Sequence, residues 1–570
     1  MSRRSISLGL ALLAAVAVLA VGGSVLVGGS LGPISGGAQA GPAANGPPAN
    51  DRASVSRPEA STGGLVASAS PPAAPSPGAA TLSPGAATPA PGATPSPSAE
   101  PTAFSTPIVP VVDFRSTTTS VGPSDVAAIL AGRSATYAAL ELVAADADAI
   151  LSALGQTRPA DRSLIVRARD AGRVMRDLAA HRDRLGFLAA ADIGPGVRAI
   201  GWGGHELFGV DRVRSLADWP LEASLVRDGR QAFDPATTWT IVGGGDILLD
   251  RGVARQVTLL HKGVDFPFDG GTAEITGRFC CSSFGWQLPR VRRTGNAGAV
   301  RHLLESADLA VANFENPSPD AFRYHTHGTV FSAEPRLIDG LAGAGIDWVS
   351  LANNHIGDAG RRGILQTIEN LHERAIDTSG AGATDAAAHR AALLRAGGLE
   401  VAFLGYDTIA PAYAAGADRP GNAQMTPEAV RADVAAARRA GADVVVVYPH
   451  WGVEYTVRPT ALQRSLARAA IDAGADLVIG NHPHWVQGLE YYGGKLIAYA
   501  HGNFIFDQSW SRATQEGVIG RYVFYGDRLV AARYYPVVIS DDVQPQLVGG
   551  EEAEAILGRM RLATGVMSGE

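Results

Sequence analysis

Short apolar runs that end in polar corners recur along the chain from Thr237 onward. In order, they read WTIVGGGD, ADLAVANFE, IDWVSLANNH, LEVAFLGYD, ADVVVVYPHWG, ADLVIGNHPH and LIAYAHGNF. Segments with helical periodicity follow many of these runs, and strands that alternate with helices are typical of a largely parallel, buried sheet. The pattern predicts one α/β domain over residues 237–540, followed by a helical tail over residues 541–570.

A smaller region with mixed periodicity precedes this domain, over residues 107–230. It opens on the strand pattern IVPVVDF and continues with helical periodicity in PSDVAAILAG and RSLIVRARDAGRVMRDLAAHRDRLGFL. Strand signals return near VRAIGW and in LFGV. We therefore expect a small α/β accessory module. It shows no set of acid, base and nucleophile, and His205, in the Gly-rich segment GWGGHELFG, is typical of a turn residue.

The N-terminal pattern predicts an export signal. Arg3 and Arg4 precede an apolar stretch from about Ile6 to Leu31, and no further charge follows until Asp51. About 20 apolar residues span a bilayer as a helix, whereas the small residues of AQA at 38–40 suit a cleavage site. Residues 1–40 are thus either a membrane anchor with its positive end inside or a cleaved signal peptide. The protein would face outside on the cell membrane or be secreted.

Residues 41–106 consist almost entirely of Pro, Ala, Ser, Thr and Gly. Such a segment cannot offset its ordering entropy by burying apolar side chains, so we expect a disordered linker. This linker and the export segment reduce the number of folded parts that 570 residues first suggest.

Charge and cysteine content exclude several classes of protein. The net charge of −7 argues against a general nucleic-acid-binding protein, which needs a basic face. The two cysteines, Cys280 and Cys281, are adjacent, which excludes a disulfide framework and a Cys-rich zinc site. They form either a vicinal disulfide or two thiols in an insertion loop.

The ends of the predicted strands carry the chemistry. They present, in chain order, Asp246, Asn313, Glu315, Asn353, Asn354, His355, Asp358, His450, Glu454, Asn481, His482, His484, His501 and Asn503. Ligands of open α/β sheets bind outside the carboxyl ends of the strands. Carboxylates, carboxamides and imidazoles without thiolates suit a divalent ion such as Mn, Zn or Fe. One such corner is an ordinary cap or turn, but their recurrence predicts a metal site.

In this order the blocks GGGDILL, ADLAVANFENP, GIDWVSLANNHIGDAG, YPHWGVEY and GADLVIGNHPHWVQGLEYYGGKLIAYAHGNF resemble the CapA/PgsA family of capsule (poly-γ-glutamate) biosynthesis proteins. That family is similar in fold to the calcineurin-like metallophosphoesterases. The resemblance covers roughly residues 237–540 and does not extend over 107–230. It implies a metallophosphoesterase-like layered α/β sandwich for the larger domain.

The resemblance also implies a set of metal ligands for one or two divalent ions. They are Asp246, Glu315, Asn354, His450, His482 and His484. Glu315 stands where those enzymes place a bridging aspartate, and the two histidines of the closing His-x-His would serve one metal each. His355 would act on the leaving group or on the charge of the transition state. Five neighbours would orient these groups without binding metal, namely Asn313, Asp358, Glu454, His501 and Asn503.

The sequence departs from the metallophosphoesterase pattern at two positions. Leu248 stands where those enzymes carry a histidine ligand, and Glu315 is one methylene longer than the aspartate it replaces. Both departures leave open whether two metals bind at once. The glycines at 243–245 form no P-loop, because no GK[ST] follows, and we expect them to let the backbone turn tightly at the metal. His325 and His327 either line the mouth of the site or belong to an ordinary exposed loop.

Three functions compete at this point. In the first, the protein acts in the biosynthesis of a capsule or poly-γ-glutamate-like polymer through a metal-dependent hydrolase-like site. In the second, it is a phosphomonoesterase or phosphodiesterase with another cell-surface substrate. In the third, it is a non-catalytic scaffold of a membrane polymer-synthesis complex. The expected partners are the surface polymer or its precursor, membrane components of polymer synthesis, and the membrane through the N-terminus, but no nucleic acid.

Overall fold

The computed structural model describes residues 102–568, except for 228–232, 283–284 and 286. These residues all belong to one unit that runs from Pro95 to Glu570. The predicted export segment at 1–40 and nearly all of the predicted linker lie outside them. Among the residues described, no helix combines the length and the apolar character that a membrane crossing requires.

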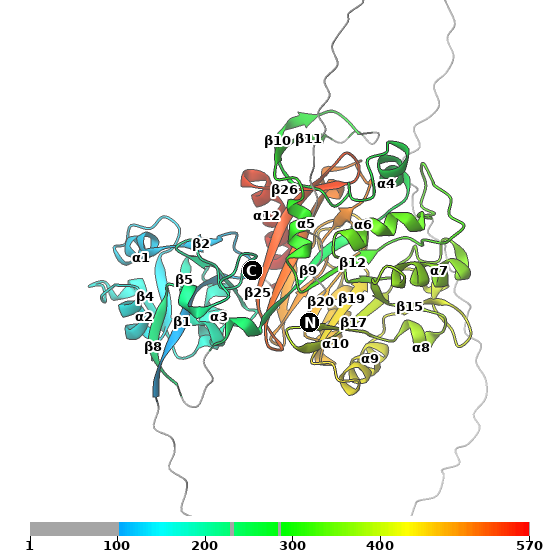
Figure 1. The fold of residues 1–570 in the computed structure, drawn as a ribbon. Coiled ribbons are helices and arrows are strands. Elements are labelled where there is room, and N and C mark those ends of the chain that lie inside the picture. The colour runs from blue at the N-terminus through cyan, green and yellow to red at the C-terminus, as the bar shows by residue number, and fades with distance from the viewer. Residues whose placement is uncertain (1–101, 228–232, 283–284, 286, 569–570) are drawn as a thin grey trace, which may run out of the picture. The chain divides into compact units, whose positions relative to one another are not determined.

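The smaller region is an α/β module built on a mixed sheet (Figure 1). Its strands follow the order β4-β3-β5-β1-β6, and β8 also pairs with β1. The strands are β1 (Thr102–Asp113), β2 (Ser120–Val121), β3 (Ala139–Val143), β4 (Ile165–Ala168), β5 (Arg184–Ala189), β6 (Val197–Ala199), β7 (Gly201–Trp202) and β8 (Glu222–Arg227), and the helices are α1 (Pro123–Leu130), α2 (Ala147–Ala153) and α3 (Ala171–Ala180).

Three details of this module differ from the prediction. Residues 102–106, assigned to the linker, belong to β1, because their backbone pairs with β8 from Thr102 to Pro107. The sequence predicts helix over 162–188, yet only α3 in this segment is an α-helix; β4 and β5 flank it and pair in parallel with β3. Residues 207–210 form no strand; they lie in a loop in which Leu207 and Phe208 pack into the core of the module.

The larger region contains two sheets. The first has the strand order β11-β10-β26-β25-β24-β9-β12-β13-β14 with β23 beside β9, and the second has the order β16-β17-β19-β20-β22-β21. Strands of the first sheet are β9 (Thr238–Ile247), β10 (Thr272–Phe279), β11 (Leu288–Gly295), β12 (Leu309–Phe314), β13 (Trp348–Ser350), β14 (Asp377–Ser379), β23 (Asn503–Ile505), β24 (Glu516–Tyr525), β25 (Arg528–Ser540) and β26 (Gln544–Val548). Strands of the second are β16 (Ala392–Ala396), β17 (Leu399–Asp407), β19 (Val444–His450), β20 (Leu477–Ile479), β21 (Leu489–Tyr492) and β22 (Lys495–Ala498), and β15 (Ala381–Gly382) pairs with β18 (Gly421–Asn422) apart from both.

Helices cover the outer faces of the two sheets. The helices of this region are α4 (Arg251–Ala254), α5 (Ala299–Glu305), α6 (Ile338–Gly343), α7 (Gly360–His372), α8 (Asp385–Ala388), α9 (Pro427–Arg439), α10 (Ala461–Asp472), α11 (Arg512–Gln515) and α12 (Gly550–Ser568). Apolar residues of α5, α6 and α7 pack on the first sheet, and those of α9 and α10 pack on the second. A third cluster lies between the sheets. The layered α/β fold expected from the sequence is therefore confirmed.

Strand β19 shows why the domain is layered. Val444, Val446 and Tyr448 point into the core between the sheets, whereas Val445 and Val447 pack toward α9 and α10. A strand that buries both faces reads as a continuous apolar run, because successive side chains point to opposite faces.

The single parallel sheet suggested by the pattern is wrong in detail, since the runs fall into two sheets. β9, β12, β13, β14 and β23 are parallel in the first sheet, and β17, β19, β20 and β22 are parallel in the second. Hairpin-connected strands β24 to β26 extend the first sheet in antiparallel pairing.

The glycines at 243–245 lie inside β9 and do not form a turn. A Cβ atom on Gly245 would stand 1.8 Å from the carbonyl oxygen of Gly502, and one on Gly244 would stand 2.4 Å from the ring of Phe504. These glycines allow the chain before β23 to approach β9 closely. Because of this close approach, the first residue of β23 lies beside Asp246.

The C-terminal segment is also more than a helical tail. Asp541 and Asp542 adopt left-handed backbone conformations, which suit a tight hairpin, and β26 then returns antiparallel to β25. Only α12 is helical, and its residues Ile556 and Met560 pack into the core between the sheets. The domain therefore extends beyond residue 540.

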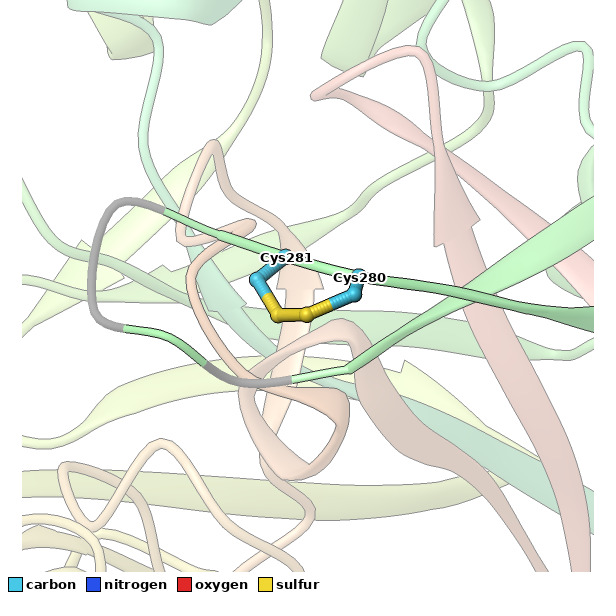
Figure 2. Close-up of a disulfide and its surroundings, with 2 residues drawn as sticks. All are labelled: Cys280 and Cys281. Atoms are coloured by element: carbon cyan, nitrogen blue, oxygen red, sulfur yellow. A yellow bond between two sulfur atoms is a disulfide. The ribbon is translucent and has the colours of Figure 1, made fainter.

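Cys280 and Cys281 follow β10, on the hairpin that this strand forms with β11. Figure 2 shows the two sulfur atoms joined in a vicinal disulfide. Of the two alternatives, the structure selects the disulfide.

Candidate metal centre

The polar strand ends of both sheets meet at one place. Asp246 is the penultimate residue of β9, Glu315 follows β12, His450 ends β19, and His482 and His484 follow β20. All five side chains are buried, with exposed fractions of 4% or less. Because the strands that carry them are parallel, their carboxyl ends gather at one edge of the sandwich, as the sequence pattern predicts.

These five residues form two groups of the kind that holds a metal ion. One group is Glu315, His450 and His482, and the other is Asp246, Glu315 and His484; in each, the potential ligand atoms lie within 4.8 Å of one another. Glu315 belongs to both groups. Its Oε1 lies 3.7 Å from Nε2 of His450 and 3.8 Å from Nε2 of His484. Glu315 would therefore contact an ion held by either group.

The chemistry of the side chains fits a bound cation. Among the described residues, Oε1 of Glu315 has no hydrogen-bond partner, although it is buried. Burial, and next the charge of Asp246, raise the pKa of Glu315 well above its usual value. Burial also lowers the pKa of His450 and His482 well below the usual value, so both imidazoles are neutral, as metal ligands must be.

Asn354 completes the predicted ligand set. Its Oδ1 lies 2.7 Å from Nε2 of His450, and Nδ1 of His482 lies 3.1 Å from the same nitrogen. A carboxamide oxygen, two imidazole nitrogens and the Glu315 carboxylate thus converge on one point. Asn354, His450, His482 and Glu315 are the residues that would hold the second ion.

His355 stands beside this set without belonging to it. Its Nδ1 is 2.9 Å from Oδ2 of Asp358, and its Nε2 is 4.0 Å from Oε1 of Glu315. The ring also packs on Phe331, with the ring centres 4.2 Å apart. A cleft of about 390 Å³ opens here and is lined by Asp358, Phe331 and His325, among others. His355 is therefore held with one nitrogen toward the ligands.

Three of the five predicted orienting residues stand next to the imidazole ligands. Asn313 Nδ2 donates to Oδ1 of Asp246 at 2.8 Å and lies 3.2 Å from Nδ1 of His450. Asn503 Oδ1 lies 2.9 Å from Nδ1 of His484. Glu454 is more distant, with its Oε1 3.9 Å from Nε2 of His484 and its side chain 43% exposed.

Asp358 contacts His355 and is itself held by two hydrogen bonds. The backbone N–H of Phe331 donates to its Oδ2, and the Tyr413 hydroxyl donates to its Oδ1. His501 is the residue that the structure does not bring to the imidazole ligands. Its Nε2 lies 2.8 Å from the hydroxyl of Tyr522 and its Nδ1 3.3 Å from the carbonyl of Gly244. It packs behind β9 instead, since it precedes β23 and points into the interior.

Leu248 supplies no ligand to the centre. It is fully buried in an apolar cluster with Phe331, Phe506 and Ile539. The position that carries histidine in metallophosphoesterases is here part of the hydrophobic packing beside the site.

Sequence reasoning missed several residues near the centre. Arg251 packs its guanidinium over the rings of Phe331 and Phe506, at 4.9 and 5.8 Å, and pairs with Asp507. Tyr455 stacks near His484, with ring centres 6.0 Å apart. The only signal in the sequence was their position a few residues after a strand end.

The backbone at the centre is strained. His482 and His484 have φ values of 95° and 55°, and Arg251 and Tyr455 have φ values of 49° and 60°. Residues other than glycine rarely adopt these backbone angles, and such strained residues cluster at functional sites. Four left-handed residues around one set of ligands therefore mark a site whose geometry is held by its surroundings.

Residues 240–508 match the family described as bacterial capsule synthesis protein PGA_cap. The capsule biosynthesis protein CapA of Bacillus anthracis is 33% identical over 240 residues, which cover 40% of this chain and 58% of that protein. A probable polyglutamine synthesis accessory protein of Mycobacterium tuberculosis is 28% identical over 353 residues, covering 57% of this chain and 86% of its own length. The chain spans less than two thirds of the CapA protein that it matches.

Among solved structures, a 5'-nucleotidase precursor from Thermus thermophilus aligns with a TM-score of 0.32 and 13% identity, covering 58% of this chain and 59% of that chain. The layered fold stands on the sheets themselves. The family match spans every predicted metal ligand, from Asp246 to His484. Through residues 240–508, this chain belongs to the CapA/PgsA family of bacterial capsule synthesis proteins.

Proposed function

We propose that this protein acts in the biosynthesis of a capsule or poly-γ-glutamate-like surface polymer through a metal-dependent, hydrolase-like site. The names of its relatives support the polymer. The observation that carries the chemistry is the sharing of Glu315 between two groups of buried ligands. Burial of a carboxylate oxygen without a partner among the described residues is costly, and a bound cation would offset that cost.

The ligands divide between two positions. Asp246 and His484 would hold one ion, Asn354, His450 and His482 would hold the other, and Glu315 would bridge them. Divalent ions such as Mn, Zn or Fe, when bound here, would supply a water of lowered pKa and stabilise charge on the displaced oxygen. Asn313 and Asn503 fix the orientation of these ligands through their hydrogen bonds.

His355 would donate a proton to the leaving oxygen. Asp358 accepts from its Nδ1 and stabilises the imidazolium, which leaves a proton on Nε2 facing the side of Glu315. The cleft beside Asp358 gives a chain-like substrate room to approach this nitrogen. General acid catalysis of this kind contributes about 10²- to 10⁴-fold in rate.

The proposal includes a location and partners. The charged and apolar pattern of residues 1–40 supports export, with the domain on the outer side of the cell membrane or released from it. The partners would be the surface polymer or its precursor and membrane components of polymer synthesis.

Metal analysis combined with a hydrolysis assay tests the chemistry. Full-length protein supplied with Mn²⁺ or Zn²⁺ should retain stoichiometric metal and hydrolyse bis-p-nitrophenyl phosphate. His355→Ala should keep the metal and lose at least about 100-fold in kcat. The matched control is His372→Ala, because His372 is exposed at the end of α7 and its side chain bonds only to Thr378 among the described residues. Well-folded protein without metal and without turnover would contradict the proposal.

Deletion of the gene tests the polymer. Loss or alteration of the surface polymer supports the proposed role. An unchanged coat, together with His355-dependent turnover, would favour a phosphoesterase with another cell-surface substrate. If the deletion removes the polymer coat and the His355→Ala variant restores it fully, the result would favour a scaffold.

A further inference from the structure

A second buried cluster of charged side chains lies where the module meets the first sheet. Arg198 of β6, Arg521 of β24 and Arg533 of β25 line one cavity of about 30 Å³, together with Glu206. Arg198 is 6% exposed and Arg521 is 1% exposed. Arginine is rarely buried to this degree without a charged partner.

Positive charge exceeds negative charge in this cavity. Glu206 is the carboxylate among the lining residues, and it accepts from Nη1 of Arg533 at 3.1 Å. Arg198 donates to a backbone carbonyl, that of Ser116. Arg521 donates to the hydroxyl of Ser306 at 3.1 Å and to the carbonyl of Gly209 at 3.4 Å. Three guanidinium groups against one carboxylate leave an excess of two positive charges.

Two polar atoms at this place lack partners. Within the described part of the chain, Nε of Arg521 has no acceptor and the hydroxyl of Tyr535 has no hydrogen bond. The guanidinium of Arg533 lies over the Tyr535 ring at 4.8 Å. Burial, and next the charge of Arg533, lower the pKa of Arg198 to about 10. An unsatisfied buried donor beside repelling cations is costly unless a ligand completes it.

We propose that this cavity binds a small oxyanion, a carboxylate or a phosphate group. The planar guanidinium presents paired N–H donors that match the oxygens of either group. A water molecule needs about 10–15 Å³ of such space, so the cavity has room for the oxygens of one anionic group but not for a nucleotide. The anion would enter past Arg533 and Glu206, whose side chains are 31% and 28% exposed.

This site is separate from the metal centre. Arg521 pairs in register with Val242, four residues before Asp246 on β9, which corresponds to about 13 Å along the strand. The arginines also belong to β6 of the module and to β24 and β25 of the sheet. A bound anion would therefore tie the module to the sheet, and its binding does not depend on the proposed hydrolase chemistry.

The test measures anion binding by full-length protein that has been treated with a chelator to remove metal. Inorganic phosphate, glutarate and a soluble glutamate polymer are titrated by calorimetry at constant ionic strength, with chloride as the reference. We expect saturable binding and a rise in unfolding temperature with at least one of these anions. Phosphate alone would assign the site to a free phosphate, and glutarate with the polymer would assign it to a carboxylate.

Two substitutions should change the affinity for the anion in opposite directions. Arg533→Met should weaken binding by at least about tenfold, because it removes a charged donor at a partly exposed position. Glu206→Gln should tighten binding several-fold, because it removes the competing carboxylate. The matched control is Arg290→Met, on the exposed face of β11, which should bind as the wild type does.

Several outcomes would overturn the proposal. One is the absence of binding by any of the three anions to metal-free protein. Another is equal binding by the wild type and Arg533→Met. A third is phosphate binding that requires added metal and disappears in His482→Ala, since that result would place the anion at the metal centre.

Discussion

The metal centre and the arginine cavity are both buried clusters of charged groups on the same sheet, but their signs are opposite. At the centre, Glu315 and Asp246 lie among histidines, and burial keeps the imidazoles of His450 and His482 neutral. At the cavity, Arg198 and Arg521 are bonded to neutral oxygens. In each cluster a buried polar atom lacks a partner among the described residues. The sign of the unbalanced charge is the basis of both proposals, a cation at the metal centre and an oxyanion at the arginine cavity.

The two clusters also differ in how the backbone presents them. The proposed metal ligands lie at strand ends or in the loops that follow, and two of them have left-handed backbones. The arginines project from within β6, β24 and β25. Loops after parallel strands lie at one edge of a sheet, whereas Arg521 and Arg533 meet through the register of β24 and β25, and Arg198 joins them where the module packs on the first sheet.

Substitution of Glu315 should have the largest effect. Glu315→Gln keeps the size of the side chain but removes the shared negative charge, so metal affinity should fall by more than about 100-fold. Without metal, the variant should be at least as stable as the wild type, because it no longer buries a carboxyl between Asp246 and the histidines. Chelator competition and thermal unfolding measure the two effects. Retention of wild-type affinity would rule out a bridging role.

Leu248 stands where metallophosphoesterases carry a histidine ligand. Restoring that histidine tests whether position 248 can reach the metal. Leu248→His should lower the free energy of unfolding by about 2–3 kcal/mol, because it places a polar ring among Phe331, Phe506 and Ile539. Metal affinity should not rise. A gain of affinity, measured by the same chelator competition, would mean that position 248 can still reach the metal; Leu248→Met serves as the apolar control.

Loss of an orienting residue should cost less than loss of a ligand. Asn503→Ala removes the acceptor of His484, and we expect about a tenfold loss of metal affinity. Gln508→Ala, which removes only a partner of Asn503 itself, should have a smaller effect. Equal losses in the two variants would show that His484 does not depend on Asn503 for its orientation.

Glu141 in the module tests whether burial alone marks a ligand site. It is fully buried, Arg184 donates to its Oε2 at 3.2 Å, and burial raises its pKa to about 7. Well below pH 4.5 the carboxyl is protonated in both the folded and unfolded states. As the pH rises toward 7 the unfolded chain loses the proton first, so stability should fall across this window and then level off.

Glu141→Gln should remove this pH dependence and stabilise the protein by about 1 kcal/mol at pH 8, since Arg184 loses its charged acceptor and offsets part of the gain. Chemical unfolding at pH 5 and pH 8 measures the difference. An unchanged pH profile would mean that Glu141 does not titrate here. Glu141 lies near Asp177, whose charge also raises its pKa, and a proton is enough to neutralise it.

Much of the fold and the site was predictable because the relevant signals are local. The run at 444–450 reads as a doubly buried strand from its valines alone, and the structure places β19 there. The proposed ligands His450, His482 and Glu315 were visible because each stands within a few residues of the end of an apolar run. The expected helix over 162–188 failed because the helical and strand periods overlap in short apolar runs, and pairing with β3 decided the outcome.

The sequence by itself determined which residues stand at strand ends and which chemistry they offer, because alternation of apolar and polar positions is a property of neighbouring residues. Only the tertiary structure decided that Glu315 is shared, that His501 turns toward Tyr522, and that three arginines meet beside Glu206. Those contacts join segments far apart in the chain. Their geometry depends on how sheets and strands pack, which no local pattern of side chains records.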